Sequence, residues 1–187
     1  MLKRIFDLLL ASVAISLLLP VLIFVFFLVR MTSAGPALYW SDRIGQNNIL
    51  FKMPKFRSMR TDAPVLATHL LQNPQSYLSP IGAWIRKTSL DELPQLWSII
   101  KGDMSFVGPR PALFNQSDLI ELRSKLGVDC LKPGLTGWAQ VNGRDELDIA
   151  TKVDLDYEYL QCRSFGMDLK ILWLTVLKVI RSDGVMH

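Results

Sequence analysis

The chain has little of what supports several common kinds of catalytic site. Of its 187 residues only two are cysteines, Cys130 and Cys162, and two are histidines, His69 and His187. The cysteines lie far apart without metal-site spacing, so we expect them to be reduced and structural, as in a cytosolic domain. A glycine-rich phosphate loop and a Ser-His-Asp hydrolase pattern are also absent from the sequence. Acid–base chemistry would therefore rest on carboxylates.

Basic and acidic residues are nearly balanced, at 21 and 17, and the formal net charge is +4. No dense basic block interleaved with aromatic residues occurs, which argues against a nucleic-acid surface. Half of the residues are hydrophobic, the mean hydropathy is +0.24, and the length suits one domain with a real core. A modestly basic face of this kind suits anionic lipid headgroups.

An uncharged apolar run at residues 8–29 predicts contact with a membrane. As a straight helix it would be about 33 Å long at roughly 1.5 Å per residue, which is enough to span a bilayer. Pro20 lies in the middle and predicts a kink. Basic residues flank both ends, Lys3 and Arg4 before and Arg30 after, so the positive-inside rule gives no orientation. A kinked hairpin that returns to the same face would keep both basic flanks on the cytoplasmic side. An ordinary spanning anchor is the alternative.

The remaining pattern predicts an α+β fold, mostly helical, with a small β-hairpin and amphipathic interfacial helices around the active site. Two parts are expected: a re-entrant membrane hairpin helix at residues 1–30 and a catalytic domain at residues 31–187. The last helix is apolar but carries lysines, so it suits either a membrane interface or the core. Strands are expected at 37–40 and 49–53, and helices at 63–71, 81–86, 93–101, 117–126, 149–161 and 169–180.

An adjacent acid pair, Asp91 and Glu92, precedes the helical pattern at residues 93–101. Because Pro94 is tolerated only in a first turn, this helix is expected to begin near Asp91, where free backbone N–H groups gather. Those groups would keep Asp91 ionised and help to hold phosphate oxygens. The plainer alternative is that Asp91 only caps the helix, or that Ser89 and Glu92 form a capping box.

Basic side chains accompany the acid pair. Residues 108–111 read Gly-Pro-Arg-Pro, so two prolines present Arg110 on a stiff loop, and its planar guanidinium suits bidentate binding of phosphate. Arg86 is a similar candidate, although a lone arginine is more often a solvated surface charge. Lys55 and Arg57, at a cationic strand end, are further candidates for binding an anionic substrate.

Taken together, these motifs resemble the monotopic phosphoglycosyl transferases of the bacterial sugar-transferase family. The resemblance covers nearly the whole chain, to residue 180. The chain departs from the usual family pattern at Leu19, where serine often precedes the proline, and at Ser41, where glutamine is expected. The motifs are KFRSM at 55–59, RKTSLDELPQ at 86–95, KGDMS at 101–105, GPRP at 108–111 and KPGLTGWAQ at 132–140.

The resemblance implies an enzyme at the cytoplasmic face of the bacterial inner membrane that moves a sugar-1-phosphate from a UDP-sugar to polyprenol phosphate. Such enzymes need Mg²⁺ and begin the assembly of glycoprotein glycans, O-antigen or capsule. In the implied mechanism Asp91 forms a covalent phosphosugar intermediate with release of UMP, and Glu92 holds the metal. The resemblance also raises Asp156 and Asp168 as positions for metal or substrate. A solvated or helix-capping carboxylate is the alternative for each.

Two other functions stay open at this point. One is a membrane-anchored scaffold that binds phosphorylated headgroups without catalysis, and the other is a glycosyltransferase that moves only the sugar and releases UDP. The nucleotide that leaves distinguishes them. The sequence does not name the sugar, and the compact form makes an N-acetylated amino sugar the first expectation.

Overall fold

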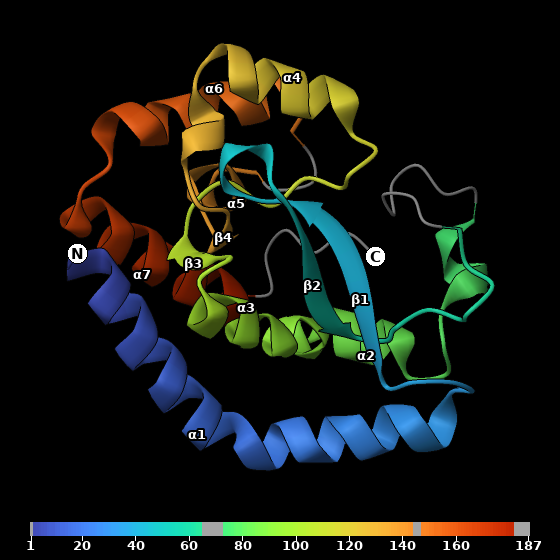
Figure 1. Cartoon of the computed structure of the whole chain (residues 1–187). Coiled ribbons are helices and arrows are strands. Elements are labelled where there is room, and N and C mark those ends of the chain that lie inside the picture. Colours follow the sequence, from blue (N-terminus) through green and yellow to red (C-terminus); the bar gives the residue numbers. More distant parts are fainter. Residues whose placement is uncertain (1, 65–72, 144–146, 182–187) are drawn as a thin grey trace.

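The computed structural model describes residues 2–64, 73–143 and 147–181, and it confirms a mostly helical fold with a small two-stranded sheet (Figure 1). The helix predicted at residues 63–71 lies largely outside the described residues. The α-helices are α1 (Leu2–Thr32), α2 (Gly82–Lys87), α3 (Leu96–Lys101), α4 (Ser117–Lys125), α5 (Trp138–Val141), α6 (Ile149–Cys162) and α7 (Phe165–Arg181). The strands are β1 (Leu38–Ile44), β2 (Leu50–Phe56), β3 (Ser105–Val107) and β4 (Gly134–Thr136).

Helix α1 is long and apolar enough to cross a membrane by length and composition. It contains Pro20, and Figure 1 shows its N-terminal and C-terminal halves running in different directions. Only Asp7, Ala11, Val25 and Val29 are buried in this helix, and its other residues are exposed or partly exposed. The helix therefore presents apolar surface along its whole length while it contacts the rest of the chain at both ends.

The first turn of α1 is fixed to the domain by a buried charge. The Lys3 ammonium lies 2.7 Å from a carboxylate oxygen of Asp168 in α7 and donates to the Tyr159 hydroxyl and the Val107 carbonyl, both at 3.0 Å. Tyr159 in turn donates to the other oxygen of Asp168 at 2.6 Å. The start of α1 is thus joined to α6, α7 and β3 at one point.

A second polar contact lies one turn further along α1. The Asp7 side chain is only 4 % exposed, and it accepts hydrogen bonds from the Ser105 hydroxyl at 2.8 Å and the Phe106 amide at 3.2 Å. Arg4 donates to the Ile99 carbonyl at the end of α3. Because buried polar groups are costly without partners, these bonds fix the register of α1 against β3.

The C-terminal half of α1 packs on the same domain through apolar contacts. Val25 and Val29 form a buried cluster with Ala37, Phe56 and Ile85, from the start of the hairpin, β2 and α2. Both halves of the helix therefore lie against one domain.

The predicted hairpin is present and longer than expected. Strands β1 and β2 pair antiparallel, in a register that aligns Leu38 with Phe56 and Ile44 with Leu50. The turn at residues 45–48 places Asn47 at a positive φ of 54°, a conformation that asparagine adopts more readily than most residues. Each strand continues beyond the predicted end, through residues such as Arg43 and Lys55 that lie outside the apolar runs.

The helix predicted at residues 93–101 is in fact two elements. A 3₁₀ helix, η4 (Leu90–Gln95), comes first, and the α-helix α3 begins only at Leu96. Pro94 lacks an N–H and disfavours α conformation in the residue before it, which explains the tighter first segment. Neither element has a side-chain cap, so the capping role considered for Asp91 and for Ser89 with Glu92 was wrong.

The parallel pair of β3 and β4 was not predicted. Ser105 pairs with Gly134 and Val107 with Thr136, so β4 lies within the KPGLTGWAQ motif at residues 132–140. A Cβ atom at Gly134 would collide with the backbone of Gly108. The glycine therefore permits β4 to approach the backbone of Gly108, where the Arg110 loop begins after β3.

We expect Asp7→Ala to destabilise the fold, because it leaves the Ser105 hydroxyl and the Phe106 amide buried without an acceptor. The loss should be about 1–3 kcal/mol, or roughly 2–4 °C of Tm for each kcal/mol. Thermal unfolding of the purified protein in one detergent measures it. Asp42→Ala, which removes an exposed ion pair with Lys52, is the control and should change Tm little. Equal Tm values for the two variants would show that the Asp7 contacts do not hold α1.

Candidate active site

The predicted acid pair lies where η4 packs against β2. Asp91 is 8 % exposed, and the Glu92 side chain is 14 % exposed. Among the described residues no hydrogen bond is made to the Asp91 carboxylate. Burial removes water from this carboxylate, and the absence of a donor leaves its oxygen lone pairs available to an electrophile.

Glu92 joins two cations from distant elements. The Lys55 ammonium, from β2, lies 2.9 Å from Oε1 of Glu92, and a terminal nitrogen of Arg110 lies 3.1 Å from the same oxygen. The Lys55 side chain is only 16 % exposed and that of Arg110 is 35 % exposed. Three of the predicted site residues thus meet at one carboxylate oxygen.

The charges of this group depend on one another. Burial raises the pKa of Asp91, and the Lys55 ammonium is the strongest of the cations that oppose the rise, while Glu92 adds to it. Burial likewise lowers the pKa of Lys55, against the attraction of Glu92. Asp91 is therefore a more basic carboxylate than usual, and Lys55 is the neighbour that does most to keep it ionised.

Arg43 is a site residue that the sequence analysis missed. It donates to the Ser41 hydroxyl at 3.0 Å and to the Pro111 carbonyl at 3.1 Å. Burial lowers the pKa of Arg43 to about 10, and the next cause is the positive charge of Arg110. The alternation of β1, which places Ser41 and Arg43 on one face, is the signal that would have found it. The hydrogen bond from Arg43 also gives Ser41 a role, as an acceptor for this arginine.

Arg86 completes the cationic group. Its Nε donates to the Ser58 hydroxyl at 2.9 Å, and burial lowers its pKa against the attraction of Asp91 and Glu92. Among the residues that the structure describes, four cations thus interact with two carboxylates, an excess of two positive charges in a partly buried site. Such a surplus favours a doubly charged anionic ligand, for which arginine is well suited. The four cations are Arg43, Lys55, Arg86 and Arg110.

Three other predicted site residues, Arg57, Asp168 and Asp156, lie away from the acid pair. Arg57 donates to the Ala34 carbonyl at 2.6 Å and so holds the segment that joins α1 to β1. Asp168 is bound by Lys3 and Tyr159 and helps to raise the pKa of that tyrosine. Within the described part of the chain, neither Arg57 nor Asp168 has a contact that connects it to the acid pair, and a substrate role for them remains a prediction.

Asp156 is 1 % exposed and lies in a buried ion pair with Arg123 of α4, at 2.6 Å. It is neither the solvated nor the helix-capping carboxylate that was considered for it. Its connection to the acid pair is indirect, because Arg123 also donates to the Arg110 carbonyl at 2.8 Å.

The donor set at the acid pair is compatible with Mg²⁺. In the part of the chain that the structure describes, no three histidine, cysteine, aspartate or glutamate side chains gather as a ready-made metal cage. Mg²⁺ does not require one, since it commonly binds one or two carboxylates together with substrate phosphates and water. Asp91 and Glu92 meet that requirement.

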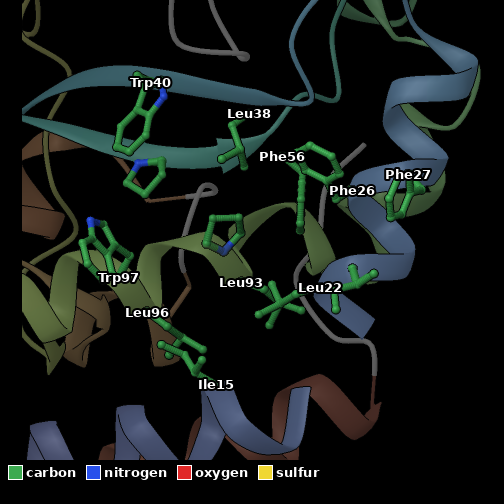
Figure 2. Close-up of a pocket in the computed structure, with 13 residues that line it drawn as sticks. Ile15, Leu22, Phe26, Phe27, Leu38, Trp40, Phe56, Leu93, Leu96 and Trp97 are labelled. Carbon is green, nitrogen blue, oxygen red and sulfur yellow. The ribbon is translucent and has the colours of Figure 1, made fainter. Parts of the chain in front are cut away.

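An apolar groove begins beside the acid pair. It has a volume of about 450 Å³ and lies between α1, the hairpin and the η4–α3 segment (Figure 2). Leu93 and Pro94, directly after Glu92, form part of its wall. The other lining residues are Ile15, Leu22, Ile23, Phe26, Phe27, Leu38, Trp40, Pro54, Phe56, Leu96 and Trp97.

A buried acid pair with surplus cations, next to an apolar groove and a long apolar helix, is typical of a membrane-associated enzyme of phosphate chemistry. The chain belongs to the bacterial sugar transferase family, whose pattern matches residues 1–182. This confirms the resemblance seen in the sequence motifs.

Three similar proteins illustrate the family. The uncharacterized sugar transferase EpsL of Bacillus subtilis is 40 % identical, over 98 % of this chain and 90 % of its own length. The undecaprenyl-phosphate glucose phosphotransferase of Komagataeibacter xylinus is 38 % identical, over 96 % of this chain but only 36 % of its own length. The UDP-glucose:undecaprenyl-phosphate glucose-1-phosphate transferase of Escherichia coli is 39 % identical, over 95 % and 40 % respectively. The chain thus spans less than half of the two relatives named for a reaction.

We expect Arg110→Ala to weaken the binding of inorganic pyrophosphate roughly tenfold or more, through loss of a charge-assisted contact. Arg110→Lys should restore only part of the affinity, because the planar fork is lost. Isothermal titration measures both. Arg60→Ala, at an exposed arginine paired with Asp62, is the control and should bind as the unsubstituted protein does. Full affinity in Arg110→Ala would make Arg110 a surface residue only.

Proposed function

We propose that the protein transfers a sugar-1-phosphate from a UDP-sugar to polyprenol phosphate and releases UMP. The observation that carries the proposal is the surplus of two positive charges around the buried Asp91 carboxylate, because a nucleotide diphosphate would balance that charge. The names of the two relatives that specify a reaction agree with it, since both describe transfer to undecaprenyl phosphate.

The first step uses Asp91 as a nucleophile. One of its oxygens attacks the β-phosphorus of the UDP-sugar, a new O–P bond forms, and the bond from that phosphorus to the oxygen bridging to the α-phosphate breaks. UMP leaves with the bonding electron pair, and the phosphosugar remains on Asp91. An ionised carboxylate is a competent nucleophile for such chemistry. Lys55, Arg110 and Arg86 neutralise charge on the phosphates as it develops.

The second step returns the carboxylate. A phosphate oxygen of polyprenol phosphate attacks the same phosphorus, the bond to Asp91 breaks, and polyprenyl diphosphosugar forms. The cations are needed again, since the acceptor and the intermediate are both anionic. When bound by Glu92 and the substrate phosphates, Mg²⁺ would supply further charge neutralisation.

The apolar groove supports a lipid acceptor. A polyprenyl chain laid between α1 and the hairpin would have its phosphate end at Leu93 and Pro94, next to the acid pair. The groove is lined by apolar side chains and the cations lie around the acid pair, so the lipid chain and the nucleotide would occupy different parts of the site.

The contacts of α1 support a re-entrant topology. Lys3 in the first turn is bound to Asp168, and Val29 near the last turn packs with Phe56, so both ends of the helix lie on one domain. A straight helix spanning a hydrocarbon core of about 30 Å would separate its ends. We therefore propose that α1 enters and leaves one leaflet, and the family resemblance favours the cytoplasmic face for the domain. The exposed apolar residues Leu169, Trp173 and Val176 of α7 would rest at the same interface.

A panel of UDP-sugars with a polyprenol phosphate acceptor tests the reaction. Release of UMP with Mg²⁺ present supports the proposal; release of UDP would indicate transfer of the sugar alone. Phosphate binding without turnover of any donor would indicate a scaffold. The panel includes UDP-glucose, the donor named for one relative, and N-acetylated amino sugars, the first expectation from the sequence.

Asp91→Asn should lower turnover by orders of magnitude while UDP-sugar binding survives, because the variant keeps the shape and loses the anionic nucleophile. Glu92→Gln should also be severely impaired, with a changed dependence on Mg²⁺ concentration. Steady-state UMP release and calorimetric binding measure the two properties separately. Asp42→Asn, at a surface carboxylate paired with Lys52, is the control. Substantial turnover by Asp91→Asn would show that Asp91 is not the nucleophile.

The pH dependence of UMP release should respond to Lys55. Asp91 must be ionised to attack, so activity is lost as the pH falls through its raised pKa. Lys55→Met removes the strongest influence that lowers this pKa, so the acid limb of the profile should move to higher pH. Lys52→Met, at an exposed neighbour on β2, should leave it in place. An unchanged acid limb in Lys55→Met would show that Asp91 does not control it.

The topology is tested by labelling single cysteines with an impermeant maleimide. Leu2 and Met31 are 64 % and 84 % exposed, so each is replaced by cysteine in a background lacking Cys130 and Cys162. Both positions should react only from the cytoplasmic side. A variant that retains only the exposed Cys130 provides the reference for that side. Labelling of position 2 from the periplasm would contradict the re-entrant topology.

A further inference from the structure

The loop that presents Arg110 is held almost entirely through its carbonyl groups. Pro109 and Pro111 have no N–H, so the loop has fewer amide donors than an ordinary one. Four successive carbonyls each accept a hydrogen bond, and two of the donors are arginine side chains. The bonds are Gly134 N to Pro109 O at 2.8 Å, Arg123 Nη1 to Arg110 O at 2.8 Å, Arg43 Nη1 to Pro111 O at 3.1 Å and Ile44 N to Ala112 O at 2.9 Å.

The bond to Arg110 itself depends on a buried ion pair. Arg123 lies on α4, with its side chain 11 % exposed, and donates from Nε at 3.0 Å and Nη2 at 2.6 Å to one oxygen of Asp156 on α6. Because Asp156 is almost wholly enclosed, its carboxylate fixes the plane of the guanidinium. The third nitrogen, Nη1, is thereby directed at the Arg110 carbonyl.

We propose that Arg123 and Asp156 are positioning residues for catalysis: together they hold the backbone of Arg110 so that its guanidinium reaches Glu92 and the substrate phosphate. The inference rests on the proposed function and gives Asp156 a role other than direct substrate binding. An enclosed carboxylate whose oxygen is already bound twice by Arg123 is not placed to contact a substrate.

Burial makes this arrangement sensitive to small changes. The Asp156 charge has Arg123 as its ion-pair partner, and removal of one partner leaves the other charge uncompensated. Arg123→Lys keeps a positive charge opposite Asp156, but an ammonium lacks the planar fork that reaches the carboxylate and the Arg110 carbonyl together. The Arg123→Lys variant therefore keeps a charge opposite Asp156 but loses the bond that positions the loop.

A double-mutant cycle tests the proposal. Arg123→Lys is made in the unsubstituted enzyme and in Arg110→Ala, and kcat/KM for UMP release and the affinity for UDP are measured for all four proteins. In the unsubstituted background Arg123→Lys should lower kcat/KM roughly tenfold, and in Arg110→Ala by less than about twofold. A residue that only stabilises the fold would lower activity by the same factor in both backgrounds.

Lys125→Arg, on the same helix and in an exposed pair with Glu121, is the matched control and should have no effect in either background. Equal factors for Arg123→Lys in the two backgrounds would overturn the positioning role. Should Arg123→Lys fail to fold, Asp156→Asn replaces it in the same cycle; failure of both to fold would make the pair a general folding element and also overturn the proposal.

The cycle distinguishes this inference from the proposed function. Absence of UMP release by the unsubstituted enzyme counts against the function, and the UDP affinities then still report whether Arg123 acts through Arg110. Coupling in the affinities supports the positioning role, and additivity contradicts it.

Discussion

Two adjacent carboxylates held out of water require positive charge nearby, and this requirement organises the protein. Asp91 and Glu92 lie on a short 3₁₀ helix, and the cations around them come from both strands of the hairpin, from α2 and from the loop after β3. None of these elements is long enough to be stable alone. The charged site is therefore complete only where the hairpin, η4, α2 and the loop after β3 pack together.

The second constraint is that a long apolar helix has both ends fixed to this domain. At its start, Lys3 and Asp7 are bound to β3, α6 and α7, and near its end Val29 packs with β2. The segment between these contacts forms one wall of the apolar groove. The same helix thus supports the strand that leads to Arg110 and lines the groove that we propose for the lipid acceptor.

The sequence predicted the hairpin and most of the longer helices, because each has a local signal, and it named Lys55, Arg86 and Arg110 as candidates from their motifs and residue types. Two kinds of feature had no local signal. The β3–β4 pair consists of three-residue parallel strands far apart in the chain, too short for a periodic pattern. The partners of Asp156 and Asp168 are 33 and 165 residues away, at Arg123 and Lys3, so only the tertiary fold shows that these carboxylates are enclosed in ion pairs.

The central claim is that Asp91 carries the phosphosugar between the two substrates. Incubation of the enzyme with UDP-sugar and Mg²⁺, without polyprenol phosphate, followed by intact-protein and peptide mass spectrometry tests it most directly. The account predicts a mass increase equal to one phosphosugar, located on Asp91 and lost when the acceptor is added. An adduct on Glu92, or no adduct together with kinetics that require both substrates before UMP leaves, would contradict it.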